Sequence, residues 1–135
     1  MKRPHIVALL FTAAVALIGC DTLNWSQYRI AGVSPAADDA KRIAEVLGSV
    51  ASREHMTPSS PKYHAEETFI SFSSHLQSPL YLDLTARYFH GDVLVDLAGP
   101  FGPKVPGFAA TGAALRAELS SSFGARLTEN NPRLE

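Results

Sequence analysis

Apolar and polar residues alternate along several short stretches of this chain and recur at three- and four-residue spacings along two longer ones. Alternation predicts strands with one buried face, and the longer spacing predicts amphipathic helices. Between them, prolines, glycines and polar residues predict loops. The predicted order is a strand over 25–33, a helix over 35–54, a strand over 68–74, strands over 80–89 and 92–98, and a helix over 108–123.

The first predicted helix has a start signal as well as a periodic apolar face. Ser34 fits the N-cap, Pro35 fits the first helical position, and Asp38 and Asp39 fall in or just past the first turn. The apolar positions, spaced by four, three, four and three residues, are Ala36, Ala40, Ile43, Leu47 and Val50. They form one side of a helix, which predicts that this side is buried.

The second predicted helix turns a different set of residues toward the core. Its predicted core-side residues are Phe108, Leu115, Leu119 and Phe123. Gly124 is its predicted stop, with residues 125–127 as an alternative continuation. Polar or proline-marked loops are predicted over 55–66 and 99–107, and a polar tail over 128–135.

His90-Gly91 predicts the tight turn of a β-hairpin. If the strands 80–89 and 92–98 pair across it, the numbers of opposed residues sum to 181. Three apolar pairs then share one face: Tyr88 with Val93, Ala86 with Val95, and Leu84 with Leu97. A slip of one residue destroys this segregation, so the hydrophobic pattern itself predicts the register.

These elements predict an α+β domain with two layers. A four-stranded, mainly antiparallel sheet has one apolar face, which two helices on that same face cover, in the order βαβββα. In an alternative, the first strand–helix–strand unit is a right-handed crossover, which makes the sheet mixed. The sequence leaves the strand order open.

Composition narrows the classes of function. The chain has 135 residues, 12 Lys and Arg against 13 Asp and Glu, and one cysteine. This balance gives no electrostatic footprint for nucleic acid, so no nucleic-acid partner is expected. A single cysteine excludes an intramolecular disulfide framework and a zinc site built from cysteines.

The N-terminus carries a targeting pattern. Lys2 and Arg3 precede an uncharged run from Ile6 to Ile18, which is too short to span a bilayer and fits the core of a secretory signal. The run ends in Leu17-Ile18-Gly19-Cys20, an aliphatic residue, a permissive one, a small one and a cysteine. This segment resembles the lipobox of bacterial lipoproteins.

The resemblance implies that Cys20 is the lipidation site and becomes the first residue of the mature chain. Residues 1–19 are then a removed signal peptide, 20–24 the lipidated cysteine and a short tether, and 25–127 the folded domain. The implied location is a cell membrane, facing the periplasm. Asp21 resembles an inner-membrane retention signal, which favours the inner over the outer membrane.

Two groups of residues offer candidate chemistry, and each has a simpler interpretation. The mature histidines are His55, His64, His75 and His90, and they are predicted to be solvated loop residues rather than metal ligands, since no recognised ligand spacing appears. A hydrolase triad would combine Ser71, Ser73 or Ser74 with His75 or His90 and Asp92 or Asp96. No Gly-x-Ser-x-Gly turn accompanies these residues, so they are predicted to be surface residues of the sheet.

The remaining acidic and aromatic residues also favour surface roles. Asp83, Asp92 and Asp96 fall on the predicted solvent face with Arg87, which predicts charge pairing there. Two candidate contact surfaces remain: the proline-rich segment from Pro100 to Phe108, otherwise a rigid connector, and the exposed-face aromatics Tyr81 and Phe89.

The expected function is therefore a non-catalytic interaction or structural role at the membrane surface, with no cofactor. The membrane is one partner, through the lipid on Cys20, and an envelope protein is the expected second. A lipid-anchored binder of a small ligand or metal is the alternative, and a hydrolase ranks below both. The helix opened by Ser34-Pro35 and the C-terminal helix ending at Phe123-Gly124 give a layout similar to small uncharacterised Gram-negative envelope lipoproteins, which implies no activity.

Overall fold

The computed structural model describes residues 24–33, 38–77, 80–99 and 108–130. Within them the strands are β1 (Asn24–Ile30), β2 (Thr57–Pro58), β3 (Thr68–Gln77), β4 (Leu80–Phe89), β5 (Asp92–Gly99) and β6 (Leu127–Glu129). The helices are α2 (Asp38–Arg53) and α3 (Phe108–Phe123), and a 3-10 turn, η1 (Gly124–Arg126), follows α3. The predicted N-cap Ser34 and the adjoining Pro35 lie outside the described residues.

These strands form a single antiparallel sheet, and the α+β class predicted from the sequence is confirmed. The strand order is β2-β3-β4-β5-β1-β6. The predicted count of four strands is too low, because β2 and β6 add two short edge strands. The mixed-sheet alternative is wrong, since every described strand pair is antiparallel.

The hairpin of β4 and β5 has the predicted register. Leu84 pairs with Leu97, and Tyr88 pairs with Val93. The turn residues His90 and Gly91 have φ of 48° and 80°. These angles are those of a type I′ turn, whose twist matches that of the flanking strands.

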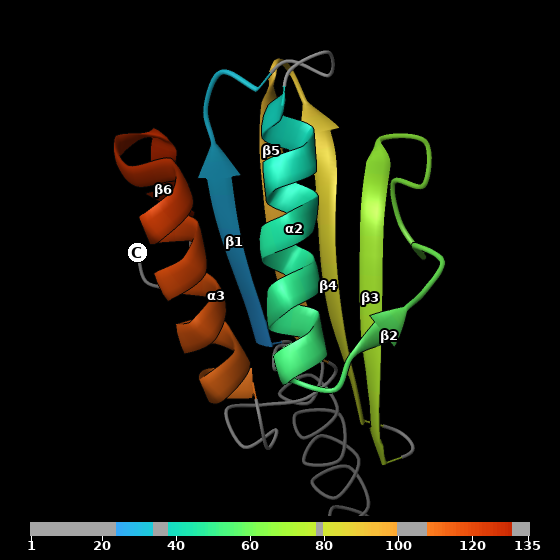
Figure 1. Ribbon diagram of the computed structural model, residues 1–135. Helices are drawn as coiled ribbons and strands as arrows, with labels where there is room; N and C mark the ends of the chain where they lie inside the picture. Colours follow the sequence, from blue (N-terminus) through green and yellow to red (C-terminus); the bar gives the residue numbers. More distant parts are fainter. Residues whose placement is uncertain (1–23, 34–37, 78–79, 100–107, 131–135) are drawn as a thin grey trace, which may run out of the picture.

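Both helices lie on the same face of the sheet (Figure 1). The buried residues of α2 are Ile43, Val46, Leu47, Val50 and Ala51. Those of α3 recur at every fourth position and are Thr111, Leu115, Leu119 and Phe123. They pack against the inward residues of β1, β4 and β5 in one hydrophobic cluster. Each fully buried Leu or Val side chain contributes about 1.5–3 kcal/mol relative to exposure.

Helix α2 ends in a Schellman motif that has histidine where glycine is usual. His55 has φ of 56°. The Met56 backbone N–H donates to the Ala51 carbonyl at 2.8 Å, and the His55 N–H donates to the Ser52 carbonyl at 3.4 Å. Ala51 and Met56 are both buried, which supplies the hydrophobic contact that accompanies this motif. The left-handed His55 thus turns the chain from α2 into β2.

Candidate functional site

The face of the sheet opposite the two helices presents rows of side chains that the strand register sets. Trp25, Ala98 and Asp83 are aligned across β1, β5 and β4 in one row, followed by Gln27, Asp96 and Thr85, and then by Arg29, Leu94 and Arg87. Both described helices lie on the other side (Figure 1). We call this surface the outer face. It is mostly polar and aromatic, as expected for the open side of an antiparallel sheet.

Asp96 is the centre of a hydrogen-bond network on the outer face. The indole Nε1 of Trp25 donates to Asp96 Oδ1 at 2.9 Å, and Gln27 Nε2 donates to the same oxygen at 2.7 Å. Arg87 Nε lies 3.6 Å from Asp96 Oδ2. Asn130 in turn donates through Nδ2 to Gln27 Oε1 at 2.9 Å. The network fixes the orientation of the Trp25 ring, because its only polar atom is already bonded.

The segment between β2 and β3 forms a wall beside the outer face. The Ser59 N–H donates to the Ser71 carbonyl at 3.0 Å, and the Ser59 and Ser71 hydroxyls hydrogen-bond at 3.0 Å. Further along, Lys62 Nζ lies 3.9 Å from Asp83 Oδ2. These contacts hold the 59–64 segment against β3 and β4.

A groove of about 280 Å³ lies between this wall and the sheet, open to solvent. The strands contribute Trp25, Thr68, Ser71, Asp83, Thr85, Arg87, Asp96 and Ala98, and the wall contributes Ser60, Pro61, Lys62, Tyr63 and His64. Trp25 is 38% exposed and Tyr63 is 81% exposed. The groove therefore combines two accessible aromatic rings with charged and hydroxyl groups.

The charges that line the groove are balanced and paired. Lys62 contacts Asp83, and Arg87 contacts Asp96. The Arg87 and Asp96 side chains are only 17% and 15% exposed, so water screens this pair less than a surface pair. Charge pairing of Arg87 with acidic residues of the solvent face was predicted, and the structure gives Asp96 as its partner.

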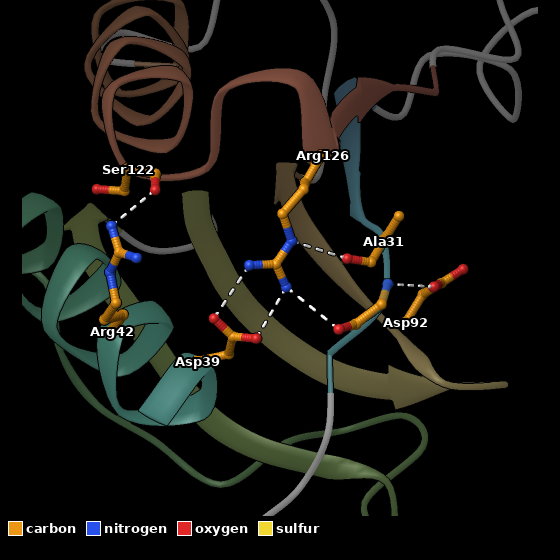
Figure 2. A network of polar contacts seen from close by, with 7 residues as sticks. Ala31, Asp39, Arg42, Asp92, Ser122 and Arg126 are labelled. Carbon is orange, nitrogen blue, oxygen red and sulfur yellow. Dashed lines mark hydrogen bonds and ion pairs between the residues drawn. The ribbon is translucent and has the colours of Figure 1, made fainter. Parts of the chain in front are cut away.

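A second polar network joins the end of β1 to α2 and η1 (Figure 2). Arg126 donates through Nη1 and Nη2 to the two carboxylate oxygens of Asp39, at 3.1 and 2.8 Å. It also donates to the carbonyls of Ala31 and Gly32, at 3.0 and 3.2 Å. Arg42 donates to the Ser122 carbonyl at 2.7 Å. Because all these partners belong to the protein itself, the network fastens secondary-structure elements together.

Two carboxylates near this network have lowered pKa values. The hydrogen bonds from Arg126 lower the pKa of Asp39 below its usual range. The Gly32 backbone N–H, which donates to Asp92 at 2.9 Å, and the Arg29 guanidinium lower the pKa of Asp92. Each case is a carboxylate whose ionised form is favoured by donors.

Of the residues of the hydrolase alternative, the structure brings Ser71 and Asp96 into the lining of the groove, and it places His90 at the hairpin turn. The Ser71 hydroxyl bonds to Ser59, and Ser73 and Ser74 are buried. Asp92 bonds to Arg29 and Gly32, and Asp96 bonds to Trp25 and Gln27. His90 packs edge-on against Phe89 at the hairpin turn, with ring centroids 4.4 Å apart. The side chain of His75 lies outside the described residues.

The described histidines occupy left-handed turn positions. His55, His64 and His90 have φ of 56°, 52° and 48°, and all three are exposed. His64 is the one that lines the groove. Across the described residues, no three His, Cys, Asp or Glu side chains gather as a metal site.

Sequence reasoning missed the groove itself. Trp25, Tyr63 and Lys62 were not singled out as candidate binding residues, and Arg87 was expected only to pair charges. They lie far apart in the chain, and the pairing of β1 with β5 brings Trp25 beside Asp96. The sequence signal that could have indicated the groove is the single tryptophan of the chain, Trp25, at the start of a predicted strand.

Several predicted features lie outside the described residues, namely Cys20, Asp21, the 100–107 segment and the Tyr81 side chain. Phe108 begins α3 and packs against the core, and Phe89 is 37% exposed on the outer face. None of the helices in the described ranges has the length and apolar character needed to cross a membrane.

Comparison of this chain with protein-family models, curated proteins and solved structures gives no match. The functional argument therefore rests on the sequence and the geometry of the site.

Proposed function

We propose that this protein is a lipid-anchored cell-envelope protein, facing the periplasm, whose folded domain acts at the membrane surface through non-catalytic binding. Two features support the proposal. The Leu17-Ile18-Gly19-Cys20 segment resembles a lipobox and follows a basic, apolar leader. The groove on the outer face is the observation that carries a binding role.

Under this proposal the anchor lies close to one end of the groove, which runs along the sheet from the row of Trp25 to the row of Arg87. Asn24 begins β1, four residues after Cys20. Four extended residues reach at most about 14 Å, so the end of the sheet where β1 begins would lie close to the bilayer. Trp25 is on that end, paired with Ala98 of β5, in the same row as Asp83 of β4. A partner in the groove would therefore be held near the membrane surface.

The occupied hydrogen bonds of the outer face support binding rather than catalysis. Asp96 already accepts two donors and contacts Arg87, so it offers no ready base to a substrate. A general base must be within hydrogen-bond reach of the proton that it removes. An envelope protein is the proposed partner, and a small ligand is the second candidate, favoured by the size and openness of the groove.

The lipid anchor is tested by the Cys20→Ala substitution. We expect the variant to remain an uncleaved, unlipidated precursor, because the thiol is the acceptor of the lipid. Metabolic labelling with a radioactive fatty acid and the mobility of the chain on a gel give the two readouts. Labelling and processing equal to those of the parent chain would contradict the anchor.

Fractionation of the two membranes tests the position of the anchored chain. Because Asp21 resembles a retention signal, we expect the parent chain in the inner membrane and the Asp21→Ser variant redistributed toward the outer membrane. An unchanged distribution of the variant would contradict the role of Asp21.

A protein partner is tested by crosslinking in cells. A photoreactive amino acid at position 63, beside the groove, should capture a defined partner. The matched control carries the same group at position 45, an exposed position of α2 on the opposite side of the domain. Equal capture from both positions, or none from position 63, would contradict a protein-docking role for the outer face.

A further inference from the structure

We propose that the groove on the outer face binds an uncharged saccharide, with one sugar ring lying against Trp25. This inference rests on the proposed binding function and names the ligand class. It draws on three observations: the accessible aromatic rings, the polar groups around them and the balance of the charges. A sugar ring matches this combination because it has apolar C–H faces and a rim of hydroxyl groups.

Trp25 has the properties of a rigid stacking surface. Its indole N–H is bonded to Asp96, and its side chain lies on the sheet rather than on a loop. With its only donor occupied, the exposed part of the residue offers a ligand the ring alone. The face of an aromatic ring is electron-rich and attracts weakly positive C–H groups. Tyr63, 81% exposed in the opposite wall, offers a second ring.

Polar groups surround these rings at positions suited to hydroxyl recognition. On β4, Asp83 lies beside Ala98 of β5, and Thr85 lies beside Asp96 of β5. Carboxylates accept hydrogen bonds from sugar hydroxyls. Lys62 and Arg87 can donate hydrogen bonds to the oxygen atoms of the same hydroxyls. Hydroxyl groups match such a mixed set because each can donate and accept.

Charge distinguishes a saccharide from ionic ligands. Each cation that lines the groove has an acidic neighbour there: Lys62 has Asp83, and Arg87 has Asp96. An anion such as phosphate would have to break one of these pairs and leave a carboxylate beside it. A cation would face the same penalty with the signs reversed. An uncharged ligand binds without separating either pair.

The shape of the groove fits a short sugar segment. Its volume of about 280 Å³ lies at the small end of ligand sites. Because the groove is open to solvent, a bound sugar need not be fully enclosed by it. A peptide that adds a strand needs the edge of a sheet, whereas the floor of this groove is the face of β1, β5 and β4.

The single tryptophan of the chain provides a direct test, since that residue is Trp25. The full chain, purified in detergent, is titrated with maltotriose, cellotriose and chitotriose while tryptophan emission is recorded. We expect a saturable change with at least one of them, with a Kd of roughly 0.1–1 mM. The affinity should change little between low and high salt, because the ligand is uncharged.

Two variants on the same face locate the site. Tyr63→Ala should weaken binding roughly 3- to 10-fold, the range for one aromatic contact. Phe89→Ala removes another exposed ring of the outer face, one that contacts Arg87 but does not itself line the groove, and should weaken binding less than Tyr63→Ala does. Both variants are compared with the parent chain by thermal melting, so that a loss of binding is separated from a loss of fold. Equal losses in both variants would overturn the assignment to the groove.

Other results would also overturn the inference. No emission change with any of the three sugars up to about 10 mM contradicts it, as does a response confined to a trimer of galacturonate. Crosslinking from position 63 then tests the proposed binding function separately from the saccharide. Capture of a defined protein together with silent titrations removes the saccharide but leaves the binding function, whereas failure of both experiments removes both.

Discussion

Three histidines occupy backbone positions that usually favour glycine or asparagine. His55 ends α2, His64 precedes β3, and His90 opens the turn between β4 and β5, all with positive φ. Histidine tolerates this conformation better than most residues, yet it still carries steric strain. Their local backbone roles explain why these side chains are dispersed over the surface.

Two substitutions of the turn residue His90 should change the free energy of unfolding in opposite directions. His90→Asn should stabilise the protein by roughly 0.5 kcal/mol, because asparagine is favoured before glycine in a type I′ turn. His90→Ala should destabilise it, because alanine lacks this tolerance of positive φ. Urea denaturation of both variants measures the two free energies of unfolding. Equal changes in both variants would show that the lost ring contact with Phe89 matters more than the backbone.

Ser74 places a hydroxyl group in the core. The residue is 2% exposed, and its Oγ has no hydrogen-bond partner among the described residues. It lies on the inward side of β3, opposite Leu82 of β4. A buried hydroxyl without a partner costs about 1–3 kcal/mol, so we expect this residue to weaken the fold.

Removing that hydroxyl should therefore raise stability. Ser74→Ala is expected to increase the free energy of unfolding by about 1 kcal/mol. The control is Ser73→Ala on the opposite side of the same strand, where we expect little change. A Ser74→Ala variant less stable than its parent, measured by urea denaturation, would show that the hydroxyl has a partner in solution.

Short edge strands complete the sheet at both sides. β2 has two residues and β6 has three, too few for an alternating pattern to be visible in the sequence. β6 takes in Thr128 and Glu129, which the sequence places in a polar tail. Both strands are mostly exposed and polar or proline-containing. Such edges discourage pairing between sheets of different molecules.

Arg126 ties η1 to α2 and to the end of β1 (Figure 2). Arg126→Lys keeps the charge but loses the planar group that donates to Asp39 and to two carbonyls at once. We expect the melting temperature to fall by a few degrees, since the side chain is 38% exposed and solvent screens part of the ion pair.

The matched control for Arg126 is Arg53→Lys. Arg53 contacts Glu118 of α3 in a single surface ion pair, with its side chain 53% exposed. Such pairs contribute little, so we expect almost no change in the melting temperature. A loss equal to that of Arg126→Lys would mean that the multiple hydrogen bonds of Arg126 add nothing.

Acid should weaken the whole domain through its ionised carboxylates. Asp39 and Asp92 have pKa values below the ordinary 3.8 in the folded state. Their contribution to stability is complete above that value and is lost as the pH falls through the lower folded pKa. Both aspartates join the end of β1 to other elements, Asp39 through Arg126 and Asp92 through Gly32. Loosening should therefore begin there.

Asp39→Asn and Asp92→Asn should each lower stability at pH 7 and flatten its decline below about pH 4. Urea denaturation at a series of pH values measures both effects. Asp38→Asn, at an exposed neighbouring position of α2, is the control and should retain the decline of the parent chain. A decline as steep as the parent's in both test variants would contradict the role of these two carboxylates.

Local patterns predicted much of the fold. The β4–β5 register followed from apolar alternation around His90-Gly91, because a hairpin joins neighbours in the sequence and a one-residue slip exposes its apolar face. The α3 face was predicted less fully. Thr111 is buried there, although its polar hydroxyl led to no prediction that it faces the core. For β3, a bulge between Thr68 and Ile70 leaves Phe69 free to stack on Tyr88, a shift that alternation does not anticipate.

The sequence by itself determined the α+β class, the two helices and the central hairpin, since these depend on periodicity and short motifs. Only the tertiary structure decided that β1 joins β5 and that two short strands close the edges. It also formed the groove, where Trp25 Nε1 lies 2.9 Å from Asp96 Oδ1 although 71 positions separate the two residues in the chain. Such contacts depend on which strands become neighbours, and that choice reflects packing of the whole core rather than any local pattern.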